Sequence, residues 1–251
     1  MSKEYEYRNK KPDSRLADLV ESFWMLRLPT DHDKEIVVLP DGRIDLFFTI
    51  SATQTFHITL SGLETHADQV TLEAGTLMFA ISFKLLATEY ILENTVSNIL
   101  DYAKYLPDDY WGFEEADLDD FDLFCSKAEA RLLTLLPSEI DPRKQKLFEN
   151  IYSSDGALTV QELSEKAFWS SRQINRYFNK QFGISLKSYC NILRFRASFH
   201  HIREGKLFPS ENFTDQSHFI REVKKLSGVS PKELSKNKND RFIQFSFSDP
   251  E

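Results

Sequence analysis

Cysteine is almost missing from this chain of 251 residues, which removes several classes of protein at once. Cys125 and Cys190 are the only two cysteines, too few and too far apart for a disulfide framework or a zinc site. No apolar run approaches the length that spans a membrane, and the charged start, residues 1–11, is not followed by an apolar segment. We therefore expect a cytoplasmic protein with no membrane partner.

The motifs of common enzymes and cofactor sites are also lacking. There is no Gly-x-Ser-x-Gly, no phosphate loop and no dinucleotide fingerprint. His57 and His66 fall among expected strands, but a metal-binding cupin would show a His-x-His pair with a carboxylate and a later His, and that grouping is absent. We therefore expect no catalytic residue, no metal and no cofactor.

Positive charge is scarce in the first half of the chain and in excess in the second. Residues 1–140 hold 12 Lys and Arg against 26 Asp and Glu, a net charge of −14, whereas residues 141–251 hold 19 against 13, a net charge of +6. Only the second half is therefore suited to approach a polyanion such as DNA. We predict a sensor or self-association domain over 1–140, a DNA-binding domain over 141–240 and a tail over 241–251.

The first half has the pattern of a small barrel with added helices. Helical spacing of apolar residues predicts a short helix over 14–24. A strand, a tight turn and a strand are expected over 36–50, and alternation predicts further strands at 56–60 and 77–83. Several short strands within about fifty residues predict a small antiparallel barrel or sandwich. We expect a β-barrel of cupin-like type, which either holds a ligand or is filled by side chains.

Helices are expected over 97–106 and 118–136. The second has one apolar stripe, and four Asp residues lie at its N-terminal end, where the helix dipole favours them. The stripe packs either on the barrel of its own chain, which is the commoner fate, or against a second copy in a homodimer.

Segment 158–183 has a helix-turn-helix layout. Thr159, with a Glu three residues later, caps a helix over 160–167, and Ser170, with a Gln three residues later, caps a second helix that Gly183 ends. Arg and Asn side chains on its outer face can reach guanine and adenine edges. An ordinary solvated surface helix is the alternative interpretation of this face. The predicted base-reading residues here are Ser171, Arg172, Asn175 and Arg176.

A long helix over 186–202 and a second polar-faced helix, beginning after Thr214 and covering 215–226, follow. Three outward side chains of the later helix are expected to read bases: Gln216, Ser217 and Arg221. Basic side chains along all three helices are expected to contact phosphates, which positions a protein without specifying sequence. These are Lys180, Lys187, Arg194, Arg196, Lys224 and Lys225.

Segment 158–234 closely resembles the DNA-binding domain of AraC-type (AraC/XylS) transcription regulators. The resemblance rests on three short pieces: 182–185, then Asp215-Gln216-Ser217-His218-Phe219 with Arg221, and the closing 228–231. Residues 16–24 and 39–46 resemble the N-terminal sensor region of one branch of these regulators. The resemblance implies two recognition helices that enter successive major-groove segments of double-stranded DNA, with the long helix as spacer, and an unidentified small-molecule effector.

The chain departs from this family before the second recognition helix. Only residues 205–212, with Pro209 among them, are available for a bracing helix and two turns, which is too few. Either the long helix or the linker braces the second recognition helix, or its groove contact is weak. We predict an α+β, non-enzymatic, sequence-specific DNA-binding regulator. The alternatives are a small-molecule-binding or enzymatic barrel with an accessory helical domain, and a protein-binding adaptor without specific DNA binding.

Overall fold

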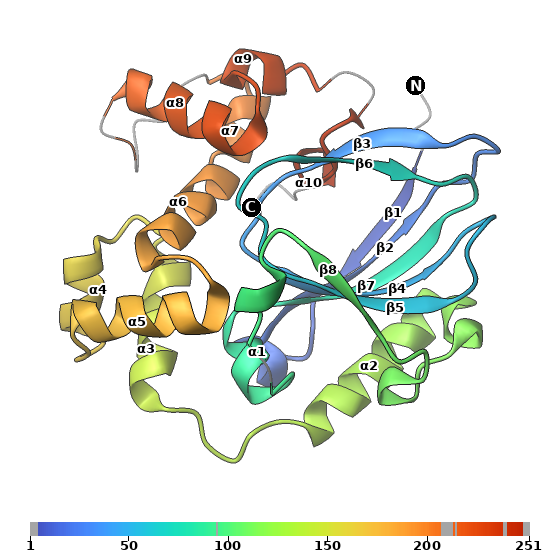
Figure 1. Ribbon diagram of the computed structural model, residues 1–251, viewed down its shortest axis with the longest axis horizontal. Coiled ribbons are helices and arrows are strands. Elements are labelled where there is room, and N and C mark those ends of the chain that lie inside the picture. The colour runs from blue at the N-terminus through green and yellow to red at the C-terminus, as the bar shows by residue number, and fades with distance from the viewer. Residues whose placement is uncertain (1–4, 94, 207–212, 214, 238–239, 248–251) are drawn as a thin grey trace. The chain divides into compact units, whose positions relative to one another are not determined.

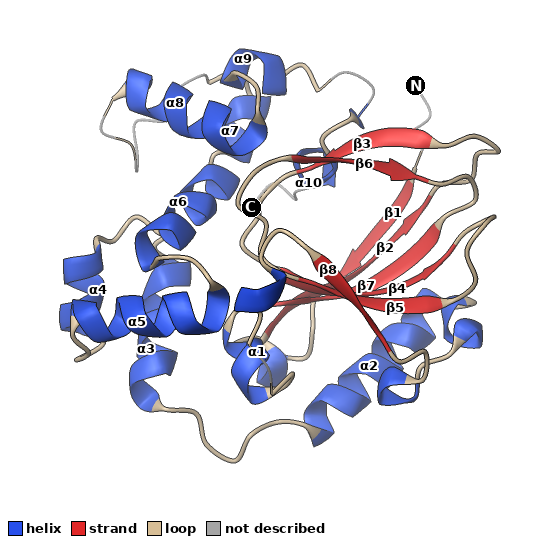
Figure 2. Cartoon of the chain, in the orientation of Figure 1, coloured by secondary structure: helices blue, strands red, loops and turns tan. Residues whose placement is uncertain are grey.

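Two compact units make up the protein. The computed structural model describes residues 5–93, 95–206, 213, 215–237 and 240–247. The sheet unit comprises Met1–Lys34, Arg43–Gly62 and Thr71–Ile140, and the helical unit comprises Glu35–Gly42, Leu63–Val70 and Asp141–Glu251. All described strands precede the helix α2 (Phe121–Thr134), and only helices follow it (Figures 1 and 2), which confirms the predicted α+β order.

An antiparallel six-stranded sheet is the scaffold of the sheet unit, in the order β1-β2-β7-β4-β5-β8. Its strands are β1 (Glu6–Lys10), β2 (Val20–Arg27), β4 (Ile44–Ile50), β5 (His57–Ser61), β7 (Leu77–Phe83) and β8 (Ala103–Leu106). β1 and β8 are its two edges, so the described strands form an open antiparallel sheet, which is not closed into a barrel but is compatible with the predicted cupin-like type.

The segment 14–24, predicted to be a helix, is instead a turn followed by a strand. Only Ser14–Leu16 form a single 3-10 turn, and the chain from Val20 onward enters β2. β2 lies between β1 and β7, with Trp24 opposite Ala80 in the register. The helical spacing of four apolar residues was therefore outweighed by pairing with β1 and with the distant β7, which no local pattern reveals.

The prediction of a helix over 97–106 was also wrong. Ser97–Ile99 form a 3-10 turn, and Ala103–Leu106 form β8, which pairs with β5. Gly62, directly after β5, permits the close approach of the turn that contains Ile99. A Cβ atom at residue 62 would lie 1.8 Å from the carbonyl oxygen of Ile99. The short helix α1 (Leu86–Tyr90) lies between β7 and this region.

Helix α2 buries its apolar stripe on the sheet of its own unit (Figure 1). The ring of Phe124 lies 5.1 Å from that of Phe48 and 5.2 Å from that of Phe79, which confirms the intramolecular alternative for this stripe. Asp120 caps the helix by accepting hydrogen bonds from the backbone N–H groups of Asp122 and Leu123.

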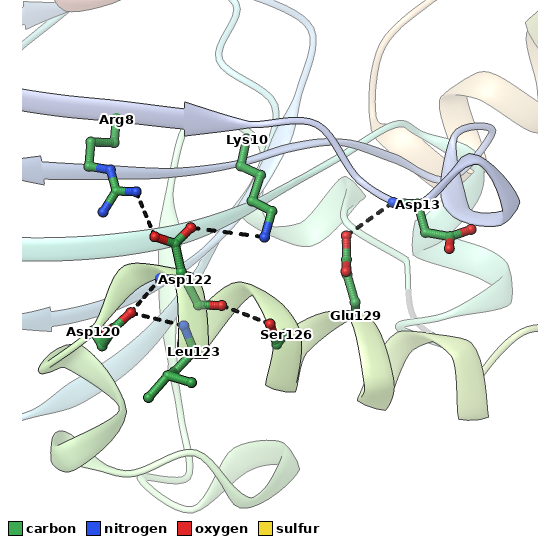
Figure 3. A network of polar contacts seen from close by, with 8 residues as sticks. All are labelled: Arg8, Lys10, Asp13, Asp120, Asp122, Leu123, Ser126 and Glu129. Atoms are coloured by element: carbon green, nitrogen blue, oxygen red, sulfur yellow. Dashed lines mark hydrogen bonds and ion pairs between the residues drawn. The ribbon is translucent and has the colours of Figure 1, made fainter.

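Polar contacts join the same helix to the edge strand β1, as Figure 3 shows. The Arg8 guanidinium donates to the Asp122 carboxylate at 2.8 Å, and this hydrogen bond holds the pKa of Asp122 below its ordinary value. The backbone N–H of Asp13 donates to the Glu129 carboxylate at 3.1 Å. Because Arg8 and Asp122 are exposed, their ion pair orients the edge strand more than it stabilises the fold.

The strands on either side of the tight turn before residue 43 do not pair with each other. β3 (Lys34–Val38) pairs with β6 (Asp68–Leu72) in a separate two-stranded sheet, whereas β4 joins the six-stranded one. The backbone N–H of Val37 donates to the Arg241 carbonyl at 2.7 Å, and that of Leu39 donates to the Gln244 side chain at 2.7 Å. The predicted tail over 241–251 therefore contains folded structure, including α10 (Ile243–Phe247).

The segment before Gly42 is held against α6 (Leu186–Ala197) within the helical unit. The hydroxyl of Tyr189, a fully buried side chain, donates to the Gly42 carbonyl at 3.0 Å and lies 3.1 Å from the hydroxyl of Tyr152. Gly42 has a φ of +78°, and an added Cβ would lie 2.9 Å from Leu193. The backbone of residue 42 is thus in contact with the centre of α6.

Helices form the remainder of the helical unit. They are α3 (Pro142–Ser153), α4 (Val160–Lys166), α5 (Ser171–Phe182), α6, α7 (Phe199–Arg203), α8 (Gln216–Ser227), α9 (Pro231–Leu234) and α10. The single long helix predicted over 186–202 is divided at Ser198 into α6 and α7. The Ser198 hydroxyl donates to the Phe195 carbonyl at 2.6 Å, a side-chain contact with the preceding turn that bends helices.

Candidate nucleic-acid interface

Helices α4 and α5 form the predicted helix-turn-helix. Thr159 and Glu162 cap α4 reciprocally: the Thr159 backbone N–H donates to the Glu162 carboxylate at 2.8 Å, and the Glu162 N–H donates to the Thr159 hydroxyl at 3.2 Å. These hydrogen bonds from Thr159 hold the pKa of Glu162 below its ordinary value. Phe168, with a φ of +50°, and Trp169 form the turn that leads into α5.

Helix α5 begins and ends where the sequence predicts. The Gln173 backbone N–H donates to the Ser170 hydroxyl at 3.3 Å, and the Ser170 N–H donates to the Gln173 side chain at 3.3 Å. Gly183 ends the helix with a φ of +78°, and its N–H donates to the Asn179 carbonyl at 3.2 Å. Both ends of α5 therefore have partners for backbone groups that a helix leaves open.

The inner face of α5 is fixed by aromatic packing. Ile174, Phe178 and Phe182 are each 0% exposed. The ring of Phe178 lies 5.1 Å from that of Phe182, 5.7 Å from that of Phe148 in α3 and 5.8 Å from that of Tyr189 in α6. Because three helices hold this ring, the orientation of the outer face of α5 follows from a close-packed core.

The outer face of α5 brings together the four side chains predicted to read bases. Arg172 and Arg176 are exposed, and Ser171 and Asn175 are half-buried. The Asn175 side-chain amide donates to the Ser171 carbonyl at 3.0 Å, which holds it along the helix. A guanidinium presents a planar fork of donors that matches a guanine edge in the major groove. Contact of these four residues with DNA stays a prediction.

Helix α8 has the same design as α5, with a corrected start. Its N-cap is Asp215, whose carboxylate accepts from the His218 backbone N–H at 2.8 Å, whereas the predicted cap, Thr214, lies outside the described residues. Gly228 ends the helix with a φ of +75°. The side chains predicted to face inward are buried, and those predicted to read bases are exposed. The buried ones are Phe219, Val223 and Leu226, and the exposed ones are Gln216, Ser217 and Arg221.

Support for α8 comes from α6. The short segment that the sequence offers for a bracing helix falls largely on residues 207–212, which lie outside the described residues. The Asn191 amide of α6 donates to the Glu222 carboxylate of α8 at 3.1 Å, and the Arg194 guanidinium donates to the Asn191 side chain. Of the alternatives left open by the sequence, contact with the long helix is therefore the one observed.

The predicted phosphate contacts differ in their exposure. Four lysines are exposed, whereas Arg194 and Arg196 are half-buried, and Arg194 donates to Asn191, the α6 residue that contacts α8. A structural role for Arg194 therefore competes with phosphate binding, because its guanidinium already has a protein acceptor. The exposed lysines are Lys180, Lys187, Lys224 and Lys225.

Sequence reasoning missed a group of cations and aromatic rings at the start of α5. The Arg143 guanidinium lies 5.5 Å from the centre of the Trp169 ring, and the Lys144 ammonium lies 5.0 Å from that of Tyr177. Phe168 in the adjacent turn is 89% exposed. The basic run at 143–146 was a signal for this group, but only the fold brings the run to α5.

A surface hollow of about 520 Å³ is rich in carboxylates, and its described lining contains no histidine. The ring of His57 instead lies 5.5 Å from that of Tyr105. The described His, Cys, Asp and Glu side chains form no group of three or more that could hold a metal ion. The hollow is lined by Thr55, Phe56, Asp108, Asp109, Gly112, Phe113, Glu114 and Glu115.

No helix within the described ranges is long and apolar enough to cross a membrane.

Solved structures similar to this chain include several of ToxT from Vibrio cholerae. The chain is 12% identical to ToxT of strain O395, with 93% of this chain and 98% of that chain covered and a TM-score of 0.42. The chain is 11% identical to ToxT of strain O395 bound to (E)-4-(8-methylnaphthalen-1-yl)but-3-enoic acid, with 93% of this chain and 98% of that chain covered and a TM-score of 0.43. The chain is 11% identical to wild-type ToxT of strain SCE256 bound to an unsaturated fatty acid, with 92% of this chain and 94% of that chain covered and a TM-score of 0.40.

No curated protein gives a significant match to the chain. Residues 8–103, which run from within β1 to the first residue of β8, match a family model described as a domain of unknown function, DUF6597.

Proposed function

We propose that the chain is a non-enzymatic, sequence-specific DNA-binding transcription regulator of the AraC type. The helical unit binds double-stranded DNA, and the sheet unit responds to a small molecule or mediates self-association. The observation that carries the proposal is α5, which is capped at both ends, fixed by three buried side chains and exposes Arg172 and Arg176 one turn apart. A helix with this outer face fits the major groove and reads guanine edges there.

The distribution of charge supports the same assignment. Residues 141–251 carry a net charge of +6, although the whole chain carries −8. Exposed Lys180 and Lys187 lie at the end of α5 and the start of α6, and Lys224 and Lys225 lie in the last turn of α8. Lysines in these places neutralise phosphates on either side of a groove, so we expect affinity to fall steeply with salt concentration.

Selection of sequences from a random duplex pool at fixed salt concentration tests the proposal. A regulator of this type returns a motif with two segments, one for α5 and one for α8. An enzyme with accessory helices, or a protein-binding adaptor that keeps only the fold, returns no motif. The absence of any enriched sequence would therefore overturn the proposed function.

Replacement of Arg172 by Ala tests the assignment of α5 as a base-reading helix. We expect the variant to lose about 1–3 kcal/mol of binding free energy on the selected sequence and to relax the preference at one position. Lys180→Ala, near the other end of α5, is the matched control, since loss of a phosphate contact weakens selected and random DNA alike and lowers the salt slope by about one. Equal losses of Arg172→Ala on both DNAs would exclude base reading by Arg172.

A further inference from the structure

Helices α5 and α8 are two versions of one local design. Each has 12 residues, each follows a side-chain N-cap, and each ends at a left-handed glycine. The caps Ser170 and Asp215 are matched, and so are Gly183 and Gly228, so every residue of α8 corresponds to the α5 residue 45 positions earlier. The buried Ile174 of α5 corresponds to the buried Phe219 of α8.

This correspondence singles out a residue of α8 that the sequence pattern left aside. Asn175, on the outer face of α5, corresponds to Ile220, and Arg176 corresponds to Arg221. Ile220 is 38% exposed, and it is one of five large apolar side chains exposed in the part of the chain that the structure describes. It lies one turn from Gln216 and one turn from Lys224, both exposed, so an apolar side chain interrupts the polar outer face.

Branched apolar side chains cannot use the hydrogen-bonding groups of a base edge, but one feature of the major groove suits them. Thymine alone presents a methyl group there, and apolar side chains recognise thymine through that group. Ile220 is held in place for such a contact, because the preceding Phe219 and Val223, three residues later, are 0% exposed and Glu222 accepts a hydrogen bond from Asn191 of α6.

We propose that Ile220 is a specificity-determining residue of α8 that contacts the C5-methyl group of one thymine in the DNA site. Asn175 then reads its base in α5 by hydrogen bonds, whereas the corresponding residue of α8 reads a methyl group. The second half of the site therefore has a fixed thymine. This inference rests on the proposed function, since it concerns how α8 reads the groove that the helical unit occupies.

Removal of the methyl group from DNA tests the contact directly. With the motif selected for the full chain, each thymine of the α8 segment is replaced in turn by uracil, which lacks only that methyl group. At one position we expect the affinity of the unaltered protein to fall about fourfold, the factor that corresponds to about 0.8 kcal/mol for one buried methyl or methylene group. For Ile220→Ala, the same replacement should leave the affinity unchanged.

Two further variants make the result specific to this side chain. Ile220→Asn places the α5 residue at the α8 position, and selection with it should return adenine in place of the fixed thymine. Leu123→Ala removes an apolar side chain that is 70% exposed on α2 of the sheet unit, and it should keep the full effect of uracil. Circular dichroism and thermal unfolding of both Ile220 variants establish that the helical content and the stability of the protein are retained.

The outcomes separate the two ideas. If the unaltered protein returns no motif, the proposed function and the thymine contact are both overturned. If a motif is returned but no thymine in the α8 segment responds to uracil, or if Ile220→Ala responds as the unaltered protein does, only the thymine contact is overturned.

Discussion

Replacement of Gly42 by Ala should destabilise the helical unit much more than an ordinary glycine substitution. Gly42 adopts a φ of +78°, which only glycine adopts readily. Its missing side chain also leaves room for α6, because an added Cβ would lie 2.9 Å from Leu193 Cδ2 and 3.2 Å from Tyr189 Cε2. The substitution therefore meets two separate obstacles, one in the backbone and one in the packing.

Each obstacle has a magnitude. A left-handed conformation at a residue with a Cβ costs roughly 1–2 kcal/mol, and overpacking a close-packed core costs about 1–3 kcal/mol. Gly42→Ala should therefore lower the free energy of unfolding by about 2–5 kcal/mol. Gly228→Ala is the matched control, because Gly228 has a φ of +75° but nothing lies within 4 Å of an added Cβ. Gly228→Ala should therefore show only the cost of the left-handed backbone, about 1–2 kcal/mol.

Urea denaturation of both variants, followed by circular dichroism at helical wavelengths, measures the difference. The midpoint of the helical-unit transition should fall further for Gly42→Ala than for Gly228→Ala, at an unchanged dependence on urea concentration. Equal destabilisation by the two substitutions would refute the conclusion that the backbone at residue 42 is packed against α6.

Three other predictions follow from the described contacts. Phe124→Ala should lower the free energy of unfolding by about 3–5 kcal/mol, because the Phe124 ring lies 5.1 and 5.2 Å from the rings of two strand phenylalanines. Leu123 is 70% exposed, so Leu123→Ala should change the free energy of unfolding by less than about 0.5 kcal/mol. Urea denaturation compares the two variants. Burial raises the pKa of the Cys125 and Cys190 thiols from 9.0 to about 12, so neither should react with a thiol reagent at pH 8 before unfolding. Because the folded thiols keep protons that the unfolded ones lose, stability should fall as the pH rises from 9 towards 12, and a Cys125→Ala/Cys190→Ala variant should show a smaller fall. Thr159→Ala should lower the free energy of unfolding by about 0.5–2 kcal/mol through loss of the α4 cap. Thr159→Ser keeps a capping hydroxyl and should therefore keep most of this stabilisation.

Elements with local signals were predictable from the sequence. The starts of α4 and α5 depend on Thr159 with Glu162 and on Ser170 with Gln173, pairs only three residues apart that contact each other in the structure. The end of α5 depends on the single residue Gly183. A helix whose ends and inner face are all encoded within about fourteen residues needs no knowledge of the rest of the fold.

Strand partners were not predictable in the same way. The segment before Gly42 and β4 are adjacent in sequence and were correctly predicted as strands, but β3 pairs with β6 and β4 with β5 and β7. For β2, the choice between helix and strand was decided by β1 and β7, and the β7 partners lie at least 50 residues further along the chain. Pairing over such distances follows from the whole fold.

In the candidate interface, too, features set by neighbouring residues were predictable, whereas features set by distant contacts were not. The exposure of Arg172 and Arg176 followed from the buried positions of α5 by helical periodicity alone. The hydrogen bond of Arg194 did not, because its acceptor Asn191 is itself held by Glu222 of α8, 31 residues further along the chain. The role of Ile220 likewise became visible only when the observed caps aligned α8 with α5.

The contact between Leu39 and Gln244 also sets an order of events on the ribosome. These residues are 205 positions apart, and at about 5–20 residues per second synthesis of the chain between them takes on the order of 10–40 s. During that interval the six strands of the large sheet, which end at Leu106, are complete, while β3 still lacks the C-terminal segment that pairs with it. The strands of the large sheet are therefore available for pairing before β3 gains its C-terminal partner, and the helical unit is completed only after Gln244 has been made.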